Sequence, residues 1–211
     1  MEQEVVAAAL EQQLEGIEVR PRELPQTPAP ERCLDKPGVA HGARWEPRCI
    51  HAMMPLMGVA AQPRYVAVVG AGGEVSAEML TDAEALGAEL ARQGAVVVTG
   101  GLGGIMEAAC RGAHREGGLT LGILPGDDRR AANRWVSVAV ATGMGELRNG
   151  LVVRSCDAVI AVAGEYGTLS EIALALKAGK PVVGIGTWEI AGVRRAPDAM
   201  AAVALALVAA R

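Results

Sequence analysis

The sequence AVVVTGGLGG, residues 95–104, joins a short apolar run to four glycines within five positions. A continuous apolar run of this length is typical of a strand buried on both faces, as in a parallel sheet covered by helices. Residues 104–116 then show the helical spacing of apolar positions. The stretch therefore predicts a buried strand, a tight turn and a helix, which together are the building block of an α/β fold.

The same alternation continues on both sides of this stretch. Strands are predicted over residues 65–69, 95–99, 120–124, 157–162 and 181–185, with a weaker one over 135–140. Helices are predicted over residues 76–93, 104–116, 145–155, 168–178 and 198–210. Strands and helices that alternate in this way form a parallel sheet through right-handed crossovers. We therefore expect a doubly wound, Rossmann-like α/β domain with a mostly parallel sheet and helices on both faces.

The composition favours a core of helices on a sheet and argues against several classes of protein. Of the 211 residues 51% are hydrophobic and none is Phe, so Val, Leu, Ile and Ala must fill the core. The net charge of −4 gives no electrostatic support for binding nucleic acid. No apolar run is long and uncharged enough to span a bilayer, and the apolar segment 196–210 is better read as a buried or amphipathic helix. An acidic start and four cysteines without a CxxC pair predict a cytoplasmic protein with free thiols.

Residues 1–63 differ from the rest of the chain in composition and in the pattern of apolar residues. Eight of the eleven prolines lie there, and after a possible short helix over residues 5–14 no helical or strand period is sustained. We expect a Pro-rich, mostly irregular N-terminal extension over 1–63 and one ligand-binding domain over 64–211. The extension also contains Cys33, His41, Cys49 and His51, but their spacing matches no zinc pattern, so no metal site is predicted.

A first glycine-rich turn, residues 70–73, follows the first predicted strand. A dinucleotide-binding fingerprint would need a third glycine where Val75 stands, and the second strand does not end in the acidic residue that binds a ribose hydroxyl. A Walker-type GK[ST] motif is also missing, because Gly179 and Lys180 are followed by Pro181 rather than by Ser or Thr. We therefore predict no nicotinamide cofactor and no other cofactor.

The second turn carries Gly100, Gly101, Gly103 and Gly104 between a strand and a helix. Without Cβ atoms, backbone N–H groups can surround an anion while the helix N-terminus adds partial positive charge. The alternative is close packing of strand on helix, which needs one or two glycines. Four glycines favour contact with a phosphate group.

The third turn, residues 163–171, contains Gly164, Gly167, Thr168 and Glu171 and again precedes a helix. In one interpretation Thr168 and Glu171 form a T-x-x-E capping box and are purely structural. In the other, Gly164, Gly167 and Thr168 contact phosphate and Glu171 lies in the cleft. The motif alone leaves these alternatives even. Upstream, Arg148 opens another helix, where its guanidinium either forks onto a ligand oxygen or lies on the surface.

Taken together, these motifs resemble the LOG family, once widely labelled lysine-decarboxylase-like. Three marks are typical of that family: a glycine-rich turn after the second strand, an arginine on a later helix and a P-G-G-x-G-T-x-x-E turn. The first mark matches residues 100–104, the second matches Arg148, and the third matches residues 163–171 with Ala163 for the proline and Glu165 for the second glycine. Residues 122–126 and 143–149 look closest to a bacterial branch near the molybdenum-cofactor carrier proteins. The resemblance covers about residues 64–188.

The resemblance implies two functions of different kinds. LOG enzymes hydrolyse the N-glycosidic bond of nucleoside 5′-monophosphates, and Glu171 would then stabilise the positive charge that develops on the ribose while Arg148 positions the substrate. The carriers instead hold a phosphorylated pterin without catalysis, which the altered turn at Ala163 and Glu165 favours. The retention of Arg148 and Glu171 makes the hydrolase our first expectation and the carrier the alternative. A DNA-processing relative would need a basic patch that the sequence lacks. The family resemblance and the apolar segment 196–210 predict a homodimer.

Overall fold

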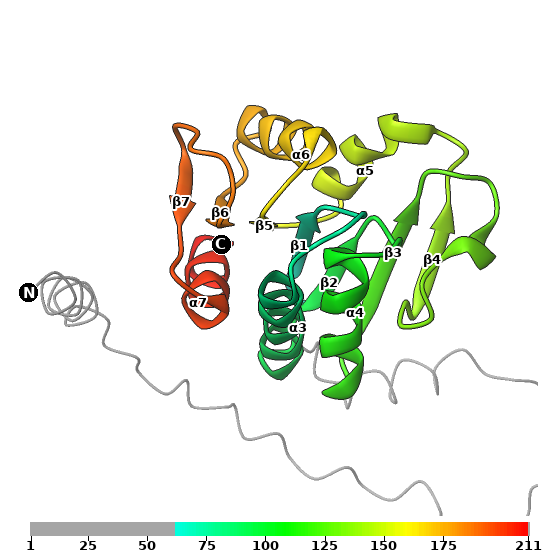
Figure 1. The fold of residues 1–211 in the computed structure, drawn as a ribbon, viewed down its shortest axis with the longest axis horizontal. Helices are drawn as coiled ribbons and strands as arrows, with labels where there is room; N and C mark the ends of the chain where they lie inside the picture. Colours follow the sequence, from blue (N-terminus) through cyan, green and yellow to red (C-terminus); the bar gives the residue numbers. More distant parts are fainter. Residues whose placement is uncertain (1–61, 211) are drawn as a thin grey trace, which may run out of the picture. The chain divides into compact units, whose positions relative to one another are not determined.

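The computed structural model describes residues 62–210, which form a seven-stranded sheet between two layers of helices (Figure 1). The strands are β1 (Tyr65–Gly70), β2 (Val96–Thr99), β3 (Thr120–Leu124), β4 (Val138–Ala141), β5 (Ala158–Val162), β6 (Val182–Ile185) and β7 (Val193–Arg195). The helices are α3 (Ala77–Arg92), α4 (Ile105–Arg115), α5 (Asn149–Arg154), α6 (Tyr166–Lys177) and α7 (Ala199–Ala209), with 3-10 turns η2 (Arg129–Ala131) and η3 (Gly145–Arg148).

All seven strands are parallel, in the order β4-β3-β2-β1-β5-β6-β7. The central strand β1 pairs with β2 on one side and with β5 on the other, so Val66 lies opposite both Val97 and Ala158. The strand order reverses at β1. Ligands of doubly wound folds bind at such a switch point, beyond the carboxyl ends of the strands. The carboxyl edge next to β1 is therefore the place to look for a site.

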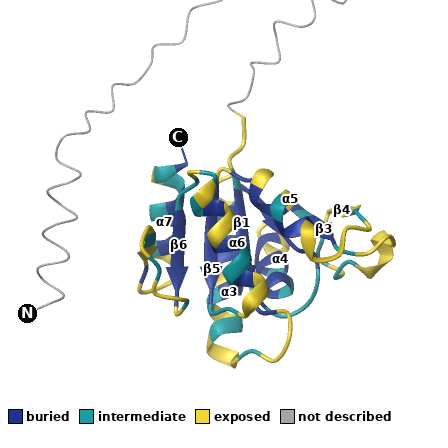
Figure 2. Ribbon diagram, turned by 90° about the horizontal axis from the view of Figure 1, so that it is seen from above, coloured by how far each residue is buried: buried dark blue, intermediate teal, exposed yellow. Residues whose placement is uncertain are grey.

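The core consists of two apolar layers, one on each face of the sheet. Val66 and Val68 of β1 pack with α3, α4 and α7, whereas Ala67 and Val69 belong to the layer under α5 and α6. This alternation follows from the period of two in a strand. Figure 2 shows the central strands β1, β5 and β6 as buried and the loops at the sheet ends as exposed. Because both faces are covered, the strands read in the sequence as continuous apolar runs.

The predicted fold class is confirmed, and the bounds of β1, β3, α3 and α4 differ from the predicted ones by one residue at most. Other elements correct the sequence analysis. β4 begins three residues later than expected, β7 was not predicted, and the expected helix 145–155 is a 3-10 turn followed by the short α5. Asp198 caps α7 by accepting from the Ala201 N–H at 2.8 Å.

The division into residues 1–63 and 64–211 stays a prediction. The expected short helix over residues 5–14 lies outside the described residues, and so do Cys33, His41, Cys49 and His51.

Helices α3 and α4 approach each other so closely that two glycines are required between them. A Cβ atom on Gly87 would lie 1.9 Å from the Ala109 carbonyl oxygen, and one on Gly112 would lie 1.9 Å from the Glu84 carbonyl oxygen. The contact is reinforced by an ion pair, with Arg111 Nη2 lying 2.7 Å from Glu84 Oε2. This packing holds α4, and therefore the turn that precedes it, against the sheet.

We expect Gly112→Ala to lower the free energy of unfolding by about 1–3 kcal/mol, because the new methyl group collides with backbone that cannot move easily. Helix propensity alone predicts the opposite sign, a gain of up to about 1 kcal/mol. Urea unfolding followed by circular dichroism measures the difference. Gly150→Ala in α5 is the matched control, since no atom lies within 4 Å of its Cβ position and a small gain is expected. A Gly112→Ala protein as stable as the wild type would contradict this account of the packing.

Candidate functional site

Arg148 is held at the carboxyl edge of the sheet by a loop that is tied to its neighbour. The loop after β4 bonds to the loop after β3, with the Gly143 N–H donating to the Gly126 carbonyl and the Gly145 N–H to the Pro125 carbonyl, each at 2.9 Å. Gly143 and Gly145 have φ of 63° and 55°, a conformation that glycine adopts without a steric cost. The 3-10 turn that follows ends at Arg148 and directs its side chain inward.

The guanidinium of Arg148 is buried over the second glycine-rich turn. The residue is 6% exposed, and its Nη1 and Nη2 atoms lie 2.5 and 2.6 Å from the position that a Cβ atom on Gly100 would take. Its Nε and Nη1 atoms have no hydrogen-bond partner among the described residues. The interpretation of Arg148 as a surface arginine is therefore wrong. A buried guanidinium with free donors is a ready partner for an anion.

Glu171, on α6, is the acidic residue that faces this guanidinium. Its Oε1 atom lies 3.6 Å from Arg148 Nη1, which is an ion pair but too long for a hydrogen bond. Glu171 is also 6% exposed. Burial raises the pKa of its carboxyl to about 7, because the attraction of Arg148 offsets only part of the desolvation, and Glu146 raises it further. The sequence analysis named Arg148 and Glu171 together, and the fold brings them together.

Thr168 and Glu171 do not form the capping box that the sequence offered as an alternative. α6 begins at Tyr166, two residues earlier than predicted, so the N-cap residue is Glu165, whose side chain accepts no capping hydrogen bond. Thr168 is therefore inside the first turn. It lies three residues before Glu171, so both side chains share one buried face of the helix.

A short chain of hydrogen bonds links α5 to the third turn. Asn149 Nδ2 donates to Ser170 Oγ at 2.9 Å, and Ser170 Oγ donates to the Gly167 carbonyl at 2.7 Å. Asn149 directly follows Arg148, so the contact that fixes α5 also fixes the turn beside the guanidinium. Sequence reasoning gave neither Asn149 nor Ser170 a role, because a single polar residue on a helix carries no signal of its partner.

The glycines of the second turn are required mainly by close packing of the protein on itself. Gly100 makes room for Arg148, a Cβ atom on Gly101 would meet Leu124 Cδ2 at 2.9 Å, and one on Gly104 would meet the Ala71 carbonyl oxygen at 2.3 Å. Gly103 differs, since its nearest neighbour is the Gly72 carbonyl oxygen at 3.5 Å. The expectation that all four glycines face a ligand thus has a competing explanation for three of them, whereas the nearest neighbour of Gly103 lies only at ordinary van der Waals distance.

The third turn departs from the family pattern in its backbone as well as in its residues. Ala163 stands in the place of the motif's proline and has φ of 51°, which a proline ring cannot adopt. Gly164 has φ of 148°, and Gly167 has no atom within 4 Å of its Cβ position. Glu165 directs Oε1 toward the first turn, 3.5 Å from the Cβ position of Gly73. The turn therefore has open backbone at Gly167 and a negative charge beside Gly73.

Sequence reasoning missed one aromatic residue at this edge. Tyr166, the aromatic residue within the third turn, is 84% exposed. Trp188, in the loop after β6, lies against Gly164. The available signal was its position just after a predicted strand, because all parallel strands end at the ligand-binding edge.

The resemblance of the sequence motifs to the LOG family is supported by a match to a family model. Residues 63–206 match the model of the SLOG cluster4 family, which is more than half of the chain. The chain belongs to the SLOG cluster4 family. An uncharacterized protein of Archaeoglobus fulgidus is 45% identical over 120 residues, which are 57% of this chain and 78% of that protein.

Solved structures similar to this SLOG cluster4 protein confirm the predicted likeness to molybdenum-cofactor carriers. A molybdenum cofactor binding protein from Rippkaea orientalis has a TM-score of 0.67 and 34% identity, covering 71% of this chain and 98% of that one. The molybdenum cofactor carrier protein of Chlamydomonas reinhardtii has a TM-score of 0.64 and 32% identity, covering 70% of this chain and 98% of that one. The likeness spans nearly the whole length of each neighbour's chain.

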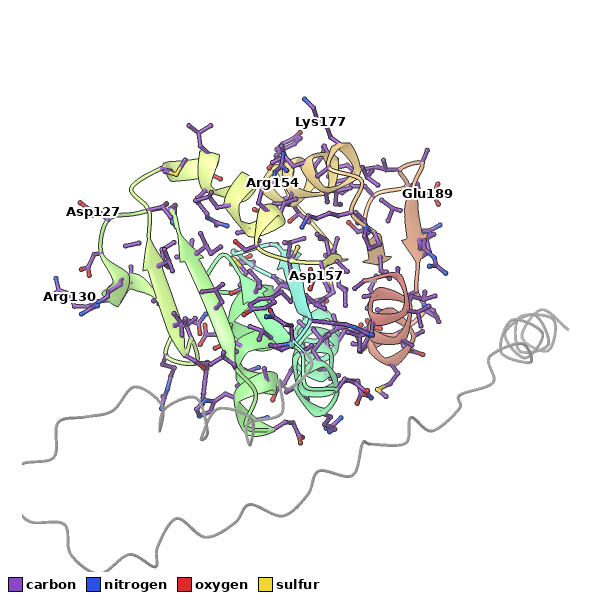
Figure 3. All side chains as sticks on the ribbon, turned by 180° about the vertical axis from the view of Figure 1, so that it is seen from behind. Asp127, Arg130, Arg154, Asp157, Lys177 and Glu189 are labelled. Carbon is purple, nitrogen blue, oxygen red and sulfur yellow. The ribbon has the colours of Figure 1, made fainter. Side chains whose placement is uncertain are left out.

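Charged side chains outside the site lie around the periphery of the domain. Figure 3 shows Asp127 and Arg130 at the β4 end of the sheet, Lys177 and Arg154 on the α5–α6 side and Glu189 near β7. Over residues 62–210, no cluster of three or more His, Cys, Asp or Glu side chains is placed to hold a metal ion. The described helices include none that is long and apolar enough to cross a bilayer.

We expect Glu171→Gln to stabilise the protein at pH 8 relative to the wild type, and to do so much less at pH 5. The folded-state pKa of Glu171, about 7, lies above the value of 4.5 for a free glutamate. The native state therefore binds a proton that the unfolded chain releases, so the wild type loses stability as pH rises from about 4.5 to 7. The neutral amide avoids that loss, which is about 2–3 kcal/mol. Denaturant unfolding at both pH values measures it, and an equal effect at pH 5 and 8 would contradict the raised pKa.

Proposed function

We propose that this protein binds and carries a phosphorylated pterin of the molybdenum-cofactor type. The similarity to carrier proteins supports this proposal, since it extends over 98% of two such chains at 32–34% identity. Fold likeness alone would not suffice, because one fold serves many functions. The proposal therefore rests on the site as well.

The observation that carries the proposal is the buried guanidinium of Arg148 with two donor atoms that no described residue satisfies. Buried donors without partners are rare, and a charged one is costly, so a missing anionic ligand is a direct explanation. Burial raises the pKa of the Glu171 carboxyl to about 7, so its protonated form is populated near neutral pH. When Glu171 is protonated, the charge of Arg148 is left for the ligand.

Uncrowded glycine backbone in the two turns that carry the site supports a phosphate-sized ligand. Gly103 belongs to the turn whose Gly100 lies under Arg148, and Gly167 lies in the first turn of α6, which also carries Glu171. Neither position has a side chain or a close neighbour in the way. Backbone N–H groups at such turns cradle anions. Thr168, buried beside Gly164, would add its hydroxyl to this cradle.

We expect the protein, expressed in a host that makes molybdenum cofactor, to retain pterin that is detected as its fluorescent oxidation product after purification. Arg148→Gln should lower the bound fraction by roughly tenfold or more, because a charge-assisted hydrogen bond is lost. Binding should tighten as pH falls from 8 to 6.5, since protonation of Glu171 removes a negative charge beside the ligand. Arg154→Gln, an exposed charge change at the end of the helix that follows Arg148, is the control. Equal retention by both variants would contradict the proposed site.

A second candidate function is N-glycosidic hydrolysis of a nucleoside 5′-monophosphate to free base and ribose 5-phosphate. Glu171, 3.6 Å from Arg148, favours it, because a carboxylate beside a substrate-orienting guanidinium can stabilise an oxocarbenium-like transition state. The motifs in the sequence favoured this hydrolase, whereas the similarity to solved structures of molybdenum-cofactor carriers favours the carrier. We keep the hydrolase as the alternative, since the chemistry of the pair permits it.

A panel of nucleoside 5′-monophosphates, with free base measured by chromatography, separates the two functions. A hydrolase should release base at a rate that rises through pH 7 as Glu171 ionises, and Glu171→Gln should lower the rate at least a hundredfold. Retained pterin without release of base from any nucleotide would leave the carrier as the function. Release of base that Glu171→Gln leaves unchanged would exclude the assigned role of Glu171.

Three further expectations complete the proposal. The partner is a small phosphorylated molecule rather than nucleic acid, which the net charge of −4 supports. A cytoplasmic location remains an inference from the free thiols, of which Cys110 and Cys156 are buried. A homodimer would cover the apolar side chains that α7 leaves exposed, such as Met200 and Val208.

A further inference from the structure

A hollow lies at the carboxyl edge of the sheet, between the loops that follow β5 and β6. Its volume is about 330 Å³, and it is lined by Ala163, Gly164, Gly186, Thr187 and Trp188. A volume of this order is that of a small-molecule site. None of the residues that line it was among the predicted site residues except Gly164.

The backbone around this pocket is held in an uncommon conformation. The Ala163 N–H donates to the Ile185 carbonyl at 3.0 Å, which joins the two loops where β5 and β6 end. Ala163, Gly164 and Gly186 all have positive φ, at 51°, 148° and 56°. For an alanine this conformation costs about 1–3 kcal/mol, and such strain persists where the surrounding structure enforces it. The rest of the fold thus imposes the shape of the pocket wall.

Two side chains complete the wall. Thr187 places its methyl group 2.4 Å from the Cβ position of Gly184, so the threonine can take this position because Gly184 has no side chain. The Thr187 hydroxyl oxygen is buried and has no hydrogen-bond partner among the described residues. Buried hydroxyls are normally paired, so the Thr187 hydroxyl is available to hydrogen-bond a bound group.

Trp188 supplies the aromatic surface of the pocket. Its side chain is 42% exposed, and its indole nitrogen lies 3.2 Å from the Cβ position of Gly164. The chain has no Phe and few other aromatic side chains. A large aromatic side chain that stays nearly half exposed over glycine backbone contributes little to the apolar core, so stability alone does not explain its position. The other described tryptophan, Trp135, is contacted by His114 and Arg134.

We propose that this pocket is the subsite for a planar, fused-ring nitrogen heterocycle, stacked on Trp188 with its edge toward Thr187. The inference deepens the proposed function and rests on it, because the ring would belong to the same ligand whose phosphate is bound near Arg148. One segment of the protein links the two binding regions. Gly164 borders the ring pocket, Thr168 lies against Gly164, and Glu171 on the same helix faces Arg148. Pterins and purines share this ring chemistry, and the test separates them.

The experiment measures binding of four probes by calorimetry and by tryptophan fluorescence: 6-hydroxymethylpterin, adenine, AMP and ribose 5-phosphate. Ring probes should quench the fluorescence of the wild type, and Trp188→Ala should weaken their binding roughly ten- to a hundredfold, the range found for loss of one stacked base. Binding of ribose 5-phosphate should stay unchanged. A preference for the pterin over adenine would identify the ring as a pterin, and the reverse would identify a purine.

Two further variants distinguish the loss of ring stacking from a folding defect. Trp188→Phe retains a stacking surface and should restore most of the affinity for the ring probes, whereas Trp135→Phe should leave quenching by them intact. If Trp188→Ala binds the ring probes as tightly as the wild type does, or weakens all four probes equally, the pocket is not a ring subsite. If no phosphorylated probe binds but the bare rings still depend on Trp188, the phosphate part of the proposed function fails while the ring subsite stands.

Discussion

The guanidinium of Arg148 is buried between the backbone at Gly100 and the carboxyl of Glu171, and the carboxyl edge of the sheet is arranged around it. Burying a cation costs several kcal/mol unless its partners are well placed, and here the ion pair at 3.6 Å satisfies it only in part. Gly100 must lack a Cβ atom because the guanidinium occupies that space. Glu171 in turn cannot ionise as an exposed glutamate does, which is why its pKa is raised. One buried charge thus determines a backbone position, a protonation equilibrium and the place where an anion is missing.

The sequence predicted the fold well where burial is complete on both faces. β1 and β5 read as apolar runs, and the structure places both within one residue of the predicted bounds. β7 was missed because it has only three residues, with sequence VRR, at the edge of the sheet, so no apolar run marks it. β4 was displaced because Trp135 and Val136 extend its apolar run, although the strand itself begins at Val138. Pairing with one neighbour leaves an edge strand half exposed, and its sequence carries less information about its bounds.

The site was predictable to the extent that topology alone decides it. Arg148 and Glu171 were singled out from motifs, and because each follows a strand of one parallel sheet, topology places both at its carboxyl edge. Their contact depends in addition on the segment after β4, since three strands separate β4 from β5. What failed depended on contacts distant in sequence. Gly101 and Gly104 serve close packing that only coordinates reveal, and Trp188 becomes part of a pocket only because Ala163 bonds to the end of β6. The capping box failed for a local reason, since α6 gains two residues before Thr168.

The third turn bears most directly on whether the site holds its ligand or cleaves it. Ala163 at φ of 51° shows that the backbone has left the conformation a proline would impose, so the motif is altered in geometry as well as in composition. Glu165 then places a carboxylate near Gly73, where it opposes a second phosphate on that side. A hydrolase needs Glu171 ionised, whereas anion binding at Arg148 is strongest when Glu171 is neutral. With a pKa of about 7 the two requirements conflict across the neutral range, and the conflict disappears if the protein only carries its ligand. Cleavage therefore places two opposed demands on this pair, whereas retention of a ligand places only one.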